Sequence, residues 1–519
     1  MARAGWDVIV VGAGSAGAAL AARSARRGKR VLLLEAGSDY RSAEMPEEWR
    51  SPNPAVALLH PTAAAGMVWA GLDAARTEKQ SAAPYWRGRG AGGSSSINGQ
   101  IAIRPPLEDF EDWSGHGCAG WSPEEVLPYF ARLEDDEEFG DEPYHGRGGP
   151  TPIHRTPAEH WGGVDGALAR SALAAGHEWA ADVNAPRATG VSPYPINSRH
   201  GRRVSVNDAY LEAARELETL TVRGDALVDR VLFEGARAVG VSAVVGGAEV
   251  AEYAETVVLS AGAIHSPAIL LRSGLGPARH LSELGIEVRQ DLPVGNGLQD
   301  HPMALVSLPL TAEAGISTPH DRHTNVCVRW SSGGPFANDL MYVALNQNVL
   351  AMSEADGSAA RGGFGVWLNR AHSRGAVRLV SADPGEQPRV RQRMLSDERD
   401  RSRLRAGLRA LVGLAERPEV TAILAGSLEQ ENAALFGVLD RDGELDEHLL
   451  STVVDAQHGT STCRMGSAAE ADAVVDPSCR VLGVDNLRVV DASIFPSVPR
   501  ANTNLATIML GELMADRID

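Results

Sequence analysis

The first residues of the chain alternate between apolar runs and small residues in an order that predicts a strand, a helix and a second strand. Residues 8–11 and 31–34 are two short apolar runs of the kind that form buried parallel strands. Between them lie a glycine-containing turn at 12–17 and an alanine-rich stretch of helical character. This order predicts a βαβ unit, a common framework for binding a dinucleotide.

The glycine turn has the spacing that a pyrophosphate site requires. Gly12 allows a tight turn, Gly14 lets the backbone approach the phosphates, and Gly17 lets the helix pack closely on the strand. The phosphates would lie against the unpaired N–H groups at the start of the helix. Glu35 ends the second strand, where a carboxylate can accept hydrogen bonds from a ribose diol, and it disfavours the 2′-phosphate of NADP. A purely structural glycine turn in a parallel sheet is the alternative.

Later apolar patterns predict two further regions, and a terminal helix that begins near Asn502 and extends to Asp516. We expect strands at 220–223, 226–233, 238–245 and 251–260 in the first region. The second region, from about 303 to 450, has short alternating strands at 325–330, 340–345, 363–368 and 375–380, followed by a helical block at 397–416. The pattern predicts an α/β fold, in which a Rossmann-like domain is joined to an α+β domain with an antiparallel sheet.

Composition and charge narrow the class of protein. The chain has 519 residues, which is too long for one simple domain, and a net charge of −18, which argues against nucleic acid and anionic membranes as partners. No apolar run approaches the ~20 residues of a membrane span, and the N-terminus has no signal pattern, so we predict a cytoplasmic protein. The four cysteines form no CxxC pair and are interpreted as free thiols. We predict no metal site, and we interpret the acidic run 134–138 as solvated surface.

A second glycine-rich segment, at 88–99, has two interpretations. Such a glycine and serine run is often a flexible linker. Here it lies between Arg89 and an apolar stretch at 97–103 rather than between two charged segments. Because backbone N–H groups and small hydroxyls can wrap a polar cofactor closely, we favour a cofactor-binding loop.

With these motifs in place, the chain resembles the glucose–methanol–choline (GMC) flavoprotein oxidoreductases. The resemblance covers nearly the whole length and follows the order of the family, which makes it specific. It rests on the segments 7–35, 88–98, 262–276, 298–302, 458–466 and 491–493, and on Asn502.

The resemblance implies FAD as the cofactor. Glu35 would bind the adenosine ribose, Val228 would contact the adenine through its backbone, and the loop 92–98 would follow the ribityl chain and the flavin ring. Some family members attach the flavin covalently through a histidine in this loop, and Ile97 stands at the corresponding place, so we expect non-covalent FAD. The full set of implied contacts is Gly12, Ala13, Gly14, Ser15, Gly17, Glu35, Ala36, Arg89, Gly92, Gly93, Ser94, Ser95, Asn98, Gly99, Val228, Ala261, Asp491, Ala492, Asn502 and Thr503.

The resemblance also implies a division into domains. The FAD-binding domain would comprise residues 1–158, 195–305 and 452–519, and the substrate-binding domain residues 159–194 and 306–451. Two departures from the family pattern concern loop geometry only: Ser461 stands where the family has glycine, and the residues before Leu298 are altered.

The implied reaction is oxidation of a primary or secondary alcohol to a carbonyl by hydride transfer to FAD. His458 and Asn502 match the active-site pair of the family. A histidine can act as a base near neutral pH because its unperturbed pKa is about 6.5. We therefore assign His458 as the base and Asn502 as the residue that orients the substrate hydroxyl. His301, beside Asp300, is interpreted as holding a loop between the domains rather than as part of a dyad.

The substrate is expected to be a small, aromatic or heteroaromatic alcohol, with oxygen or another acceptor reoxidising the flavin. Pocket residues are proposed from the second region, namely Trp330, Tyr342, Trp367 and Asn369. Two alternatives stay open: a family member with lyase-type chemistry that keeps FAD structurally, and a nicotinamide enzyme that shares only the βαβ unit. The sequence leaves the oligomeric state undetermined.

Overall fold

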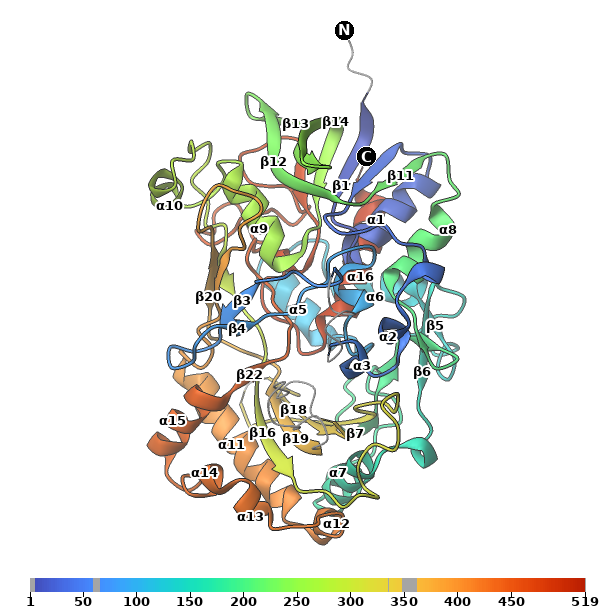
Figure 1. The fold of residues 1–519 in the computed structure, drawn as a ribbon, viewed down its shortest axis with the longest axis vertical. Coiled ribbons are helices and arrows are strands. Elements are labelled where there is room, and N and C mark those ends of the chain that lie inside the picture. The colour runs from blue at the N-terminus through green and yellow to red at the C-terminus, as the bar shows by residue number, and fades with distance from the viewer. Residues whose placement is uncertain (1–4, 59–65, 335, 348–361, 519) are drawn as a thin grey trace.

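The structure is a computed structural model that describes residues 5–58, 66–334, 336–347 and 362–518. Its long axis runs from one mixed sheet, at the top of Figure 1, to an antiparallel sheet and its covering helices at the bottom. The chain passes between the two parts several times, so each part is built from segments that are distant in sequence.

The upper sheet contains the predicted βαβ unit. Its strands follow the order β11-β2-β1-β14-β13-β12, with β23 paired to β14. The pairs β11/β2, β2/β1, β1/β14 and β14/β23 are parallel, whereas β12, β13 and β14 pair antiparallel. The strands are β1 (Trp6–Val11), β2 (Val31–Leu34), β11 (Leu220–Arg223), β12 (Ala226–Glu234), β13 (Arg237–Val245), β14 (Ala248–Leu259) and β23 (Leu487–Val489).

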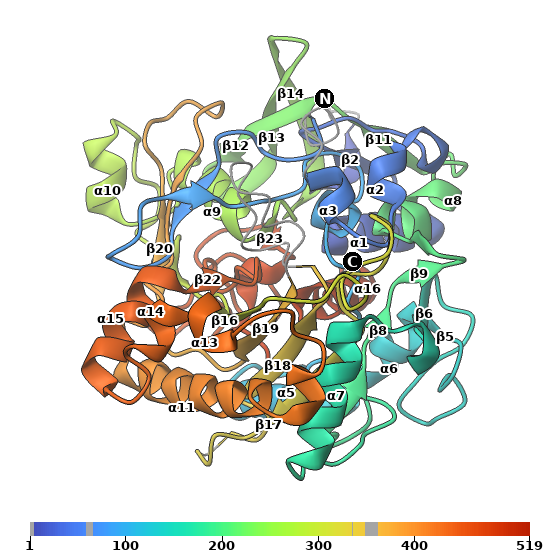
Figure 2. The same cartoon turned by 60° about the horizontal axis from the view of Figure 1, so that its bottom comes forward.

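The lower sheet is antiparallel and follows the order β22-β16-β19-β18-β17-β7. Figure 2 shows the helices α7 (Gly163–Ala174) and α11 (Glu398–Ala415) in front of it. One face of the sheet packs against these helices, and the other face turns towards the upper part. The strands are β7 (Gly190–Pro193), β16 (Pro302–Leu308), β17 (Val326–Trp330), β18 (Leu340–Leu345), β19 (Gly362–Leu368) and β22 (Val454–Asp455).

The remaining strands form three smaller sheets. The predicted strand at 375–380 is observed as β20 (Gly375–Arg378), but it lies in the separate sheet β15-β20-β21-β3-β4, because its hydrogen-bond partners are not strands of the lower sheet. The other strands are β3 (Asp73–Ala75), β4 (Ala83–Pro84), β5 (Glu134–Asp136), β6 (Thr151–Arg155), β8 (Pro195–Ile196), β9 (Ser198–Arg199), β10 (Arg202–Arg203), β15 (Asn296–Leu298) and β21 (Arg389–Arg391).

The helices confirm the predicted block 397–416, observed as α11, and the terminal helix, observed as α16 (Thr503–Arg517). None of the described helices combines the length and the apolarity that crossing a bilayer requires. The others are α1 (Ser15–Arg26), α2 (Glu47–Arg50), α3 (Ala55–Leu58), α5 (Leu107–Gly115), α6 (Pro123–Leu133), α8 (Glu212–Ala214), α9 (Gly262–Arg272), α10 (Ala278–Glu283), α12 (Pro418–Thr421), α13 (Leu428–Glu431), α14 (Ala433–Phe436) and α15 (Asp442–Thr452).

The two helices α1 and α16 pack closely because a glycine lies at their contact. A Cβ atom on Gly511 of α16 would lie 2.4 Å from the backbone oxygen of Ala16, well inside van der Waals contact. Since both helices border the glycine turn at 12–17, this contact fixes where the turn lies.

We predict that Gly511→Ala lowers the free energy of unfolding by about 1–3 kcal/mol, because the added methyl group forces the helices apart. The matched control is Gly413→Ala in α11, where a Cβ atom would meet no heavy atom within 4 Å. That control should raise the free energy by about 0.5–1 kcal/mol, the ordinary difference in helix propensity. Urea unfolding of both variants measures the difference, and an equal gain in both would contradict the close contact.

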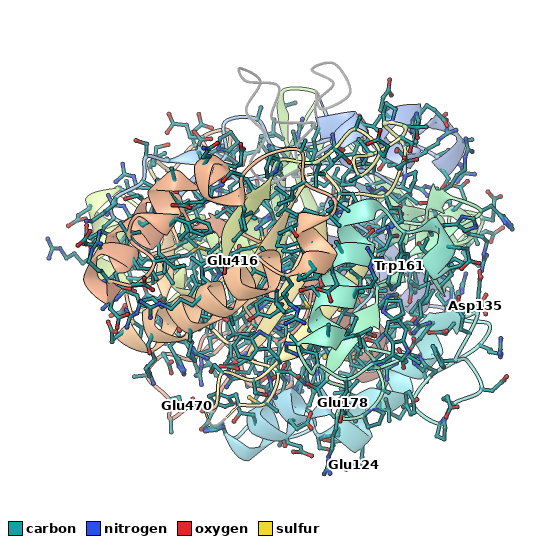
Figure 3. All side chains as sticks on the ribbon, turned by 90° about the horizontal axis from the view of Figure 1, so that it is seen from below. Glu124, Asp135, Trp161, Glu178, Glu416 and Glu470 are labelled. Atoms are coloured by element: carbon teal, nitrogen blue, oxygen red, sulfur yellow. The ribbon has the colours of Figure 1, made fainter. Side chains whose placement is uncertain are left out.

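The interpretation of the acidic run 134–138 as solvated surface is wrong for two of its residues. Strand β5 alternates its side chains, so Glu134 and Asp136 are fully buried while Asp135 points outwards (Figure 3). Figure 3 also shows that other acidic residues, among them Glu124 and Glu416, lie at the surface on separate elements.

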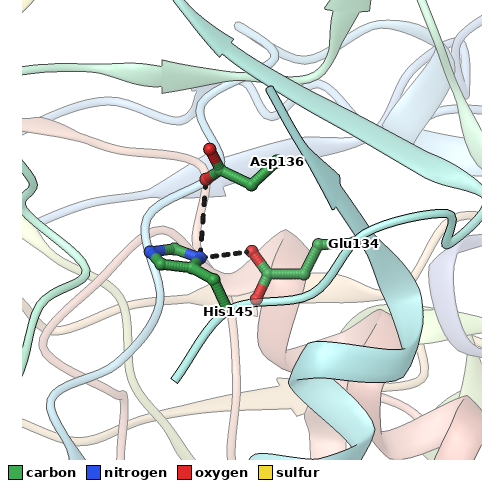
Figure 4. Close-up of side chains that lie close together, drawn as sticks. All are labelled: Glu134, Asp136 and His145. Atoms are coloured by element: carbon green, nitrogen blue, oxygen red, sulfur yellow. Dashed lines mark hydrogen bonds and ion pairs between the residues drawn. The ribbon is translucent and has the colours of Figure 1, made fainter. Parts of the chain in front are cut away.

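The buried acids belong to an ion cluster centred on His145. Its Nδ1 lies 3.0 Å from Glu134 Oε2 and 3.4 Å from Asp136 Oδ2 (Figure 4), and its Nε2 lies 2.9 Å from Asp182 Oδ2. Arg104 pairs with Glu134, and Arg155 pairs with Asp136 and Asp182.

Arginine and histidine side chains supply positive charge to the carboxylates of this cluster. The three buried carboxylates face two guanidinium groups and a protonated His145, and the exposed Glu138 also pairs with Arg155. Burial alone would lower the pKa of His145, but hydrogen bonds to Asp182 and Glu134 outweigh it and raise the pKa to about 9. Because its two arginines already occupy the carboxylates, we interpret this cluster as structural.

We predict that the cluster makes stability fall in alkaline solution. A histidine with a raised folded-state pKa stabilises the fold fully below its unfolded value of about 6.5, and this contribution is lost as the pH rises through about 9. Between pH 7 and about 9.5, the loss in unfolding free energy should therefore be larger in the wild-type protein than in His145→Gln. Urea unfolding at both pH values tests this, and equal losses would show that His145 is neutral in the fold.

Candidate active site

One large cavity extends from the carboxyl ends of β1 and β2 to the inner face of the lower sheet. Its lining includes Glu35 and Val228 in the upper part, and Trp367 and Val343 from the lower sheet. Segments from the beginning, middle and end of the chain therefore share one space.

The glycine turn after β1 has the steric features that its spacing predicts. Gly12 has a φ of +103°, and a Cβ atom on it would lie 2.5 Å from the backbone oxygen of Ser260. A Cβ atom on Gly17 would lie 2.0 Å from the oxygen of Gly12, so only glycine lets α1 begin so close to the turn. Gly14 has open space on its cavity side and comes near only Gly93.

Glu35 holds this turn together through its carboxylate. One oxygen accepts a hydrogen bond of 2.9 Å from the N–H of Ala13, and the other accepts bonds of 2.9 Å from the N–H groups of Gly37 and Gly90. Burial raises the pKa of Glu35, and these backbone bonds oppose the rise. Glu35 also lines the cavity, where the sequence predicts a ribose contact.

The second glycine segment is an ordered loop, not a linker. Gly92 and Gly93 have φ values of +90° and +52°, and residues 93–96 form a 3-10 turn. A Cβ atom on Gly93 would lie 2.8 Å from Gly14 Cα, so the two glycine loops touch. Asn98 lies two residues beyond the turn and accepts hydrogen bonds from Arg203 Nη1 and from the N–H of Gln100.

Most of the predicted cofactor residues line the cavity, and five lie behind it. Ala13, Gly17, Arg89, Gly92 and Ser95 support the lining: Arg89, for example, donates to the oxygen of Ala36 at 2.9 Å. The residues that line it are Gly12, Gly14, Ser15, Glu35, Ala36, Gly93, Ser94, Asn98, Gly99, Val228, Ala261, Asp491, Ala492, Asn502 and Thr503.

His458 and Asn502 face the same cavity and are hydrogen-bonded to each other. Asn502 Nδ2 lies 3.1 Å from His458 Nε2. On its other side, His458 Nδ1 lies 3.0 Å from His301 Nδ1, and His301 Nε2 lies 2.9 Å from the backbone oxygen of Pro499.

This chain of contacts assigns the protons. The oxygen of Pro499 can only accept, so His301 carries its proton on Nε2 and offers a lone pair at Nδ1. His458 therefore donates from Nδ1, and its Nε2 has a lone pair that faces Asn502 and the cavity. Burial, followed by His301 and Arg87, lowers the pKa of His458 well below its usual value, so the ring is a neutral base.

The structure thus places His301 in contact with His458, a contact that the sequence interpretation missed. His301 holds a loop, as expected, through Pro499, but it also fixes the tautomer of His458. The sequence feature that could have indicated this contact is the family-like segment 298–302, which contains Asp300. The carboxylate of Asp300 accepts hydrogen bonds from the backbone N–H groups of His301 and His458, at 2.7 and 2.8 Å.

The proposed pocket residues divide between the two faces of the lower sheet. Trp367 lines the cavity and its ring lies 5.4 Å from that of His458. Tyr342 faces α11, where its hydroxyl donates to Gly407, and Trp330 packs beside it. Asn369 is buried outside the lining and donates to the oxygen of Asn338.

The backbone around His458 is strained on both sides. Gln457 and Ser461 have φ values of +65° and +70°, a region that residues other than glycine seldom adopt. The predicted departure at Ser461 therefore falls where glycine is favoured. Hydrogen bonds to neighbouring segments, from the N–H of Thr460 to Gln299 and from that of Ser461 to Ala492, hold this conformation.

We predict that the ring of His458 carries its proton on Nδ1 from pH 8 to pH 6. Histidine-selective ¹⁵N NMR can observe this, with the signals assigned by their loss in His458→Gln. In His301→Phe the acceptor for the Nδ1 proton is removed, so a mixture of tautomers should appear. A protonated Nε2 in the wild-type protein would contradict the assignment.

Comparison with known proteins identifies the family. Sequence models of GMC oxidoreductases match residues 6–303 and 371–511. The chain is 36% identical to a 5-(hydroxymethyl)furfural oxidase of Methylovorus sp. (strain MP688), covering 99% of this chain and 98% of that one. It is 34% identical to an oxygen-dependent choline dehydrogenase of Photobacterium profundum, covering 99% and 93%. The crystal structure of pyridoxine 4-oxidase from Mesorbium loti superposes with a TM-score of 0.88 at 29% identity, over 99% of both chains. The protein is therefore an oxidoreductase of the GMC family.

Proposed function

We propose that this protein oxidises small, neutral aromatic or heteroaromatic alcohols to carbonyl compounds with non-covalently bound FAD. The observation that carries the proposal is the lone pair on His458 Nε2, which faces the same cavity as the two glycine loops. A base and a dinucleotide cradle in one space are what alcohol oxidation by a flavin requires.

The residues present fit FAD. The contact between Gly14 and Gly93 leaves no side chain where a pyrophosphate would approach the start of α1. Asp491 stands across the cavity, with its carboxylate fixed by the N–H groups of Gly262 and Ser493. Ile97 lines the cavity at the loop position where a covalent link to the flavin would need a nucleophilic side chain. Its apolar side chain supports non-covalent binding.

The protein's own part in the reaction is to move a proton and to orient the substrate. The alcohol hydroxyl would replace Asn502 as the donor to His458 Nε2, and the imidazole would take its proton. Asn502 Nδ2, displaced from His458, would then donate a hydrogen bond to the substrate oxygen. When bound, FAD supplies the acceptor for the hydride from the alcohol carbon.

The lining favours a neutral substrate. Among the described lining residues, the carboxylates are Glu35 and Asp491, and backbone N–H groups already bond both. Neither is bonded to the His458–Asn502 pair, and Arg87 adds positive charge to that part of the lining. A cationic substrate such as choline would lack a counter-charge there. The apolar side chains of Trp367 and Ile101 suit a substrate with a flat ring. The substrates in the names of the furfural oxidase and the pyridoxine oxidase contain such a ring.

We predict that aromatic alcohols bleach the flavin absorbance of the purified protein under anaerobic conditions, and that choline does not. His458→Gln should keep its flavin but slow the bleaching by roughly 10²–10⁴-fold, the usual contribution of a general base. His280→Gln, on α10 outside the cavity, is the control and should match the wild-type rate. Equal rates in His458→Gln and the wild type would overturn the role of His458.

The same samples also test the electron acceptor, the attachment of the flavin and the lyase-type alternative. Admission of air distinguishes an oxidase, which regains its colour quickly, from a dehydrogenase that awaits another acceptor. Acid precipitation should leave the flavin in the supernatant, whereas flavin in the pellet would contradict non-covalent binding. A yellow protein that no alcohol bleaches would favour the lyase-type alternative.

A further inference from the structure

A second pair of polar side chains, His323 and Thr324, faces the cavity from the segment that leads into β17. Neither belongs to any motif of the sequence. Both are buried, with 6% and 5% of their surface exposed. They come from the lower sheet, whereas Asn502 comes from the start of α16.

Both side chains have polar atoms without a partner. His323 Nδ1 and Thr324 Oγ1 are buried and make no hydrogen bond to any described residue. Leaving a buried polar group unpaired is energetically costly, so two neighbouring residues that do so at a cavity wall point to a ligand that completes their hydrogen bonds. The pair is the polar part of a wall otherwise formed by Tyr194, Val343 and Leu345.

The backbone fixes this pair in place. The oxygen of His323 accepts a hydrogen bond of 2.7 Å from the N–H of Asn346, directly after β18. The imidazole lies against Gly99, at 3.4 Å from the position that a Cβ atom would occupy there. Gly99 follows Asn98 in the loop proposed to border the flavin, so the imidazole lies beside the reacting part of the cavity.

The chemistry of the pair selects a neutral, oxygen-containing group. Burial, followed by Arg322 and Arg203, lowers the pKa of His323 to about 3, so the ring is neutral and offers one N–H and one lone pair. Thr324 adds a hydroxyl that donates and accepts. The two nearby guanidinium groups disfavour a cation, and Arg322 is already bonded to the oxygen of Gly99.

We propose that His323 and Thr324 recognise a second oxygen function, a hydroxyl or a carbonyl, on the ring of the substrate. The inference rests on the proposed function and extends it: one alcohol group of the substrate meets His458 and Asn502, and the second oxygen meets this pair. The preferred substrates are then aromatic alcohols with two oxygen functions, and alcohols with only an apolar ring substituent are poorer.

The test compares two alcohols of the same shape, para-benzenedimethanol and para-ethylbenzyl alcohol. The ratio of their kcat/KM values in the wild-type holoenzyme should favour the diol by about tenfold or more, the value of one hydrogen bond of about 1.4 kcal/mol. In Thr324→Val and in His323→Phe this ratio should fall towards the statistical factor of the diol's two hydroxyls. Thr324→Ser keeps the hydroxyl and should keep the ratio.

The controls separate recognition from damage to the fold. Thr311→Val makes the same change outside the cavity lining and should leave the ratio unchanged. Flavin content and the thermal midpoint of each variant are measured beside the kinetics. A wild-type ratio near the statistical factor, or an unchanged ratio in both Thr324→Val and His323→Phe, would overturn the proposal.

Dissociation constants for the same two alcohols, measured by calorimetry on the oxidised His458→Gln holoenzyme, whose flavin reduction is slowed, give a second readout. If neither alcohol reduces the flavin, the proposed function fails. The ratio of the two dissociation constants then still decides whether His323 and Thr324 select the diol.

Discussion

The arrangement of the cavity depends on one carboxylate. Glu35 binds the N–H groups of Ala13, Gly37 and Gly90, and so joins the first glycine turn, the end of β2 and the second glycine loop. These three segments are brought together by a buried acid whose negative charge is matched by backbone dipoles rather than by a salt bridge. The contact between Gly14 and Gly93 follows from it, and so does the shape of the cradle. Because the protein's own bonds hold the loops, the cradle is preorganised for a cofactor.

The part of the cavity around His458 is built on the same principle, with backbone groups setting the state of a side chain. The oxygen of Pro499 determines where His301 carries its proton, and His301 determines where His458 carries its own. No charged residue is needed in this relay, which suits a base that must stay neutral in a buried site. The two parts of the molecule contribute jointly, since His301 precedes β16 of the lower sheet and His458 belongs to the C-terminal segment.

Features encoded by neighbouring residues were predictable, and features that depend on distant partners were not. The βαβ unit, the strands β11 to β14 and β17 to β19 and the helix α11 follow from local periodicity, whereas β7, β16 and β22 of the lower sheet were not predicted. The family motifs marked His458 and Asn502. The burial of Glu134 and Asp136 depends on Arg104, Arg155, His145 and Asp182, which no local pattern connects. Likewise, Trp367 and Tyr342 both lie in buried strands, and only the tertiary packing of the sheet decides which of them meets the cavity and which meets α11. His323 and Thr324 belong to no motif, so only their unpaired atoms in the fold draw attention to them.

The strained backbone on either side of His458 has a consequence for truncated forms of the protein. A residue other than glycine in the left-handed region costs about 1–2 kcal/mol, so the segment 457–461 does not adopt its shape on its own. It does so only when Gln299, before β16, and Ala492, after β23, are in place to hold it. These contacts join parts of the chain about 160 and 30 residues away, respectively. A fragment that lacks either residue would therefore not hold His458 in its position beside Asn502, even where the glycine cradle is formed.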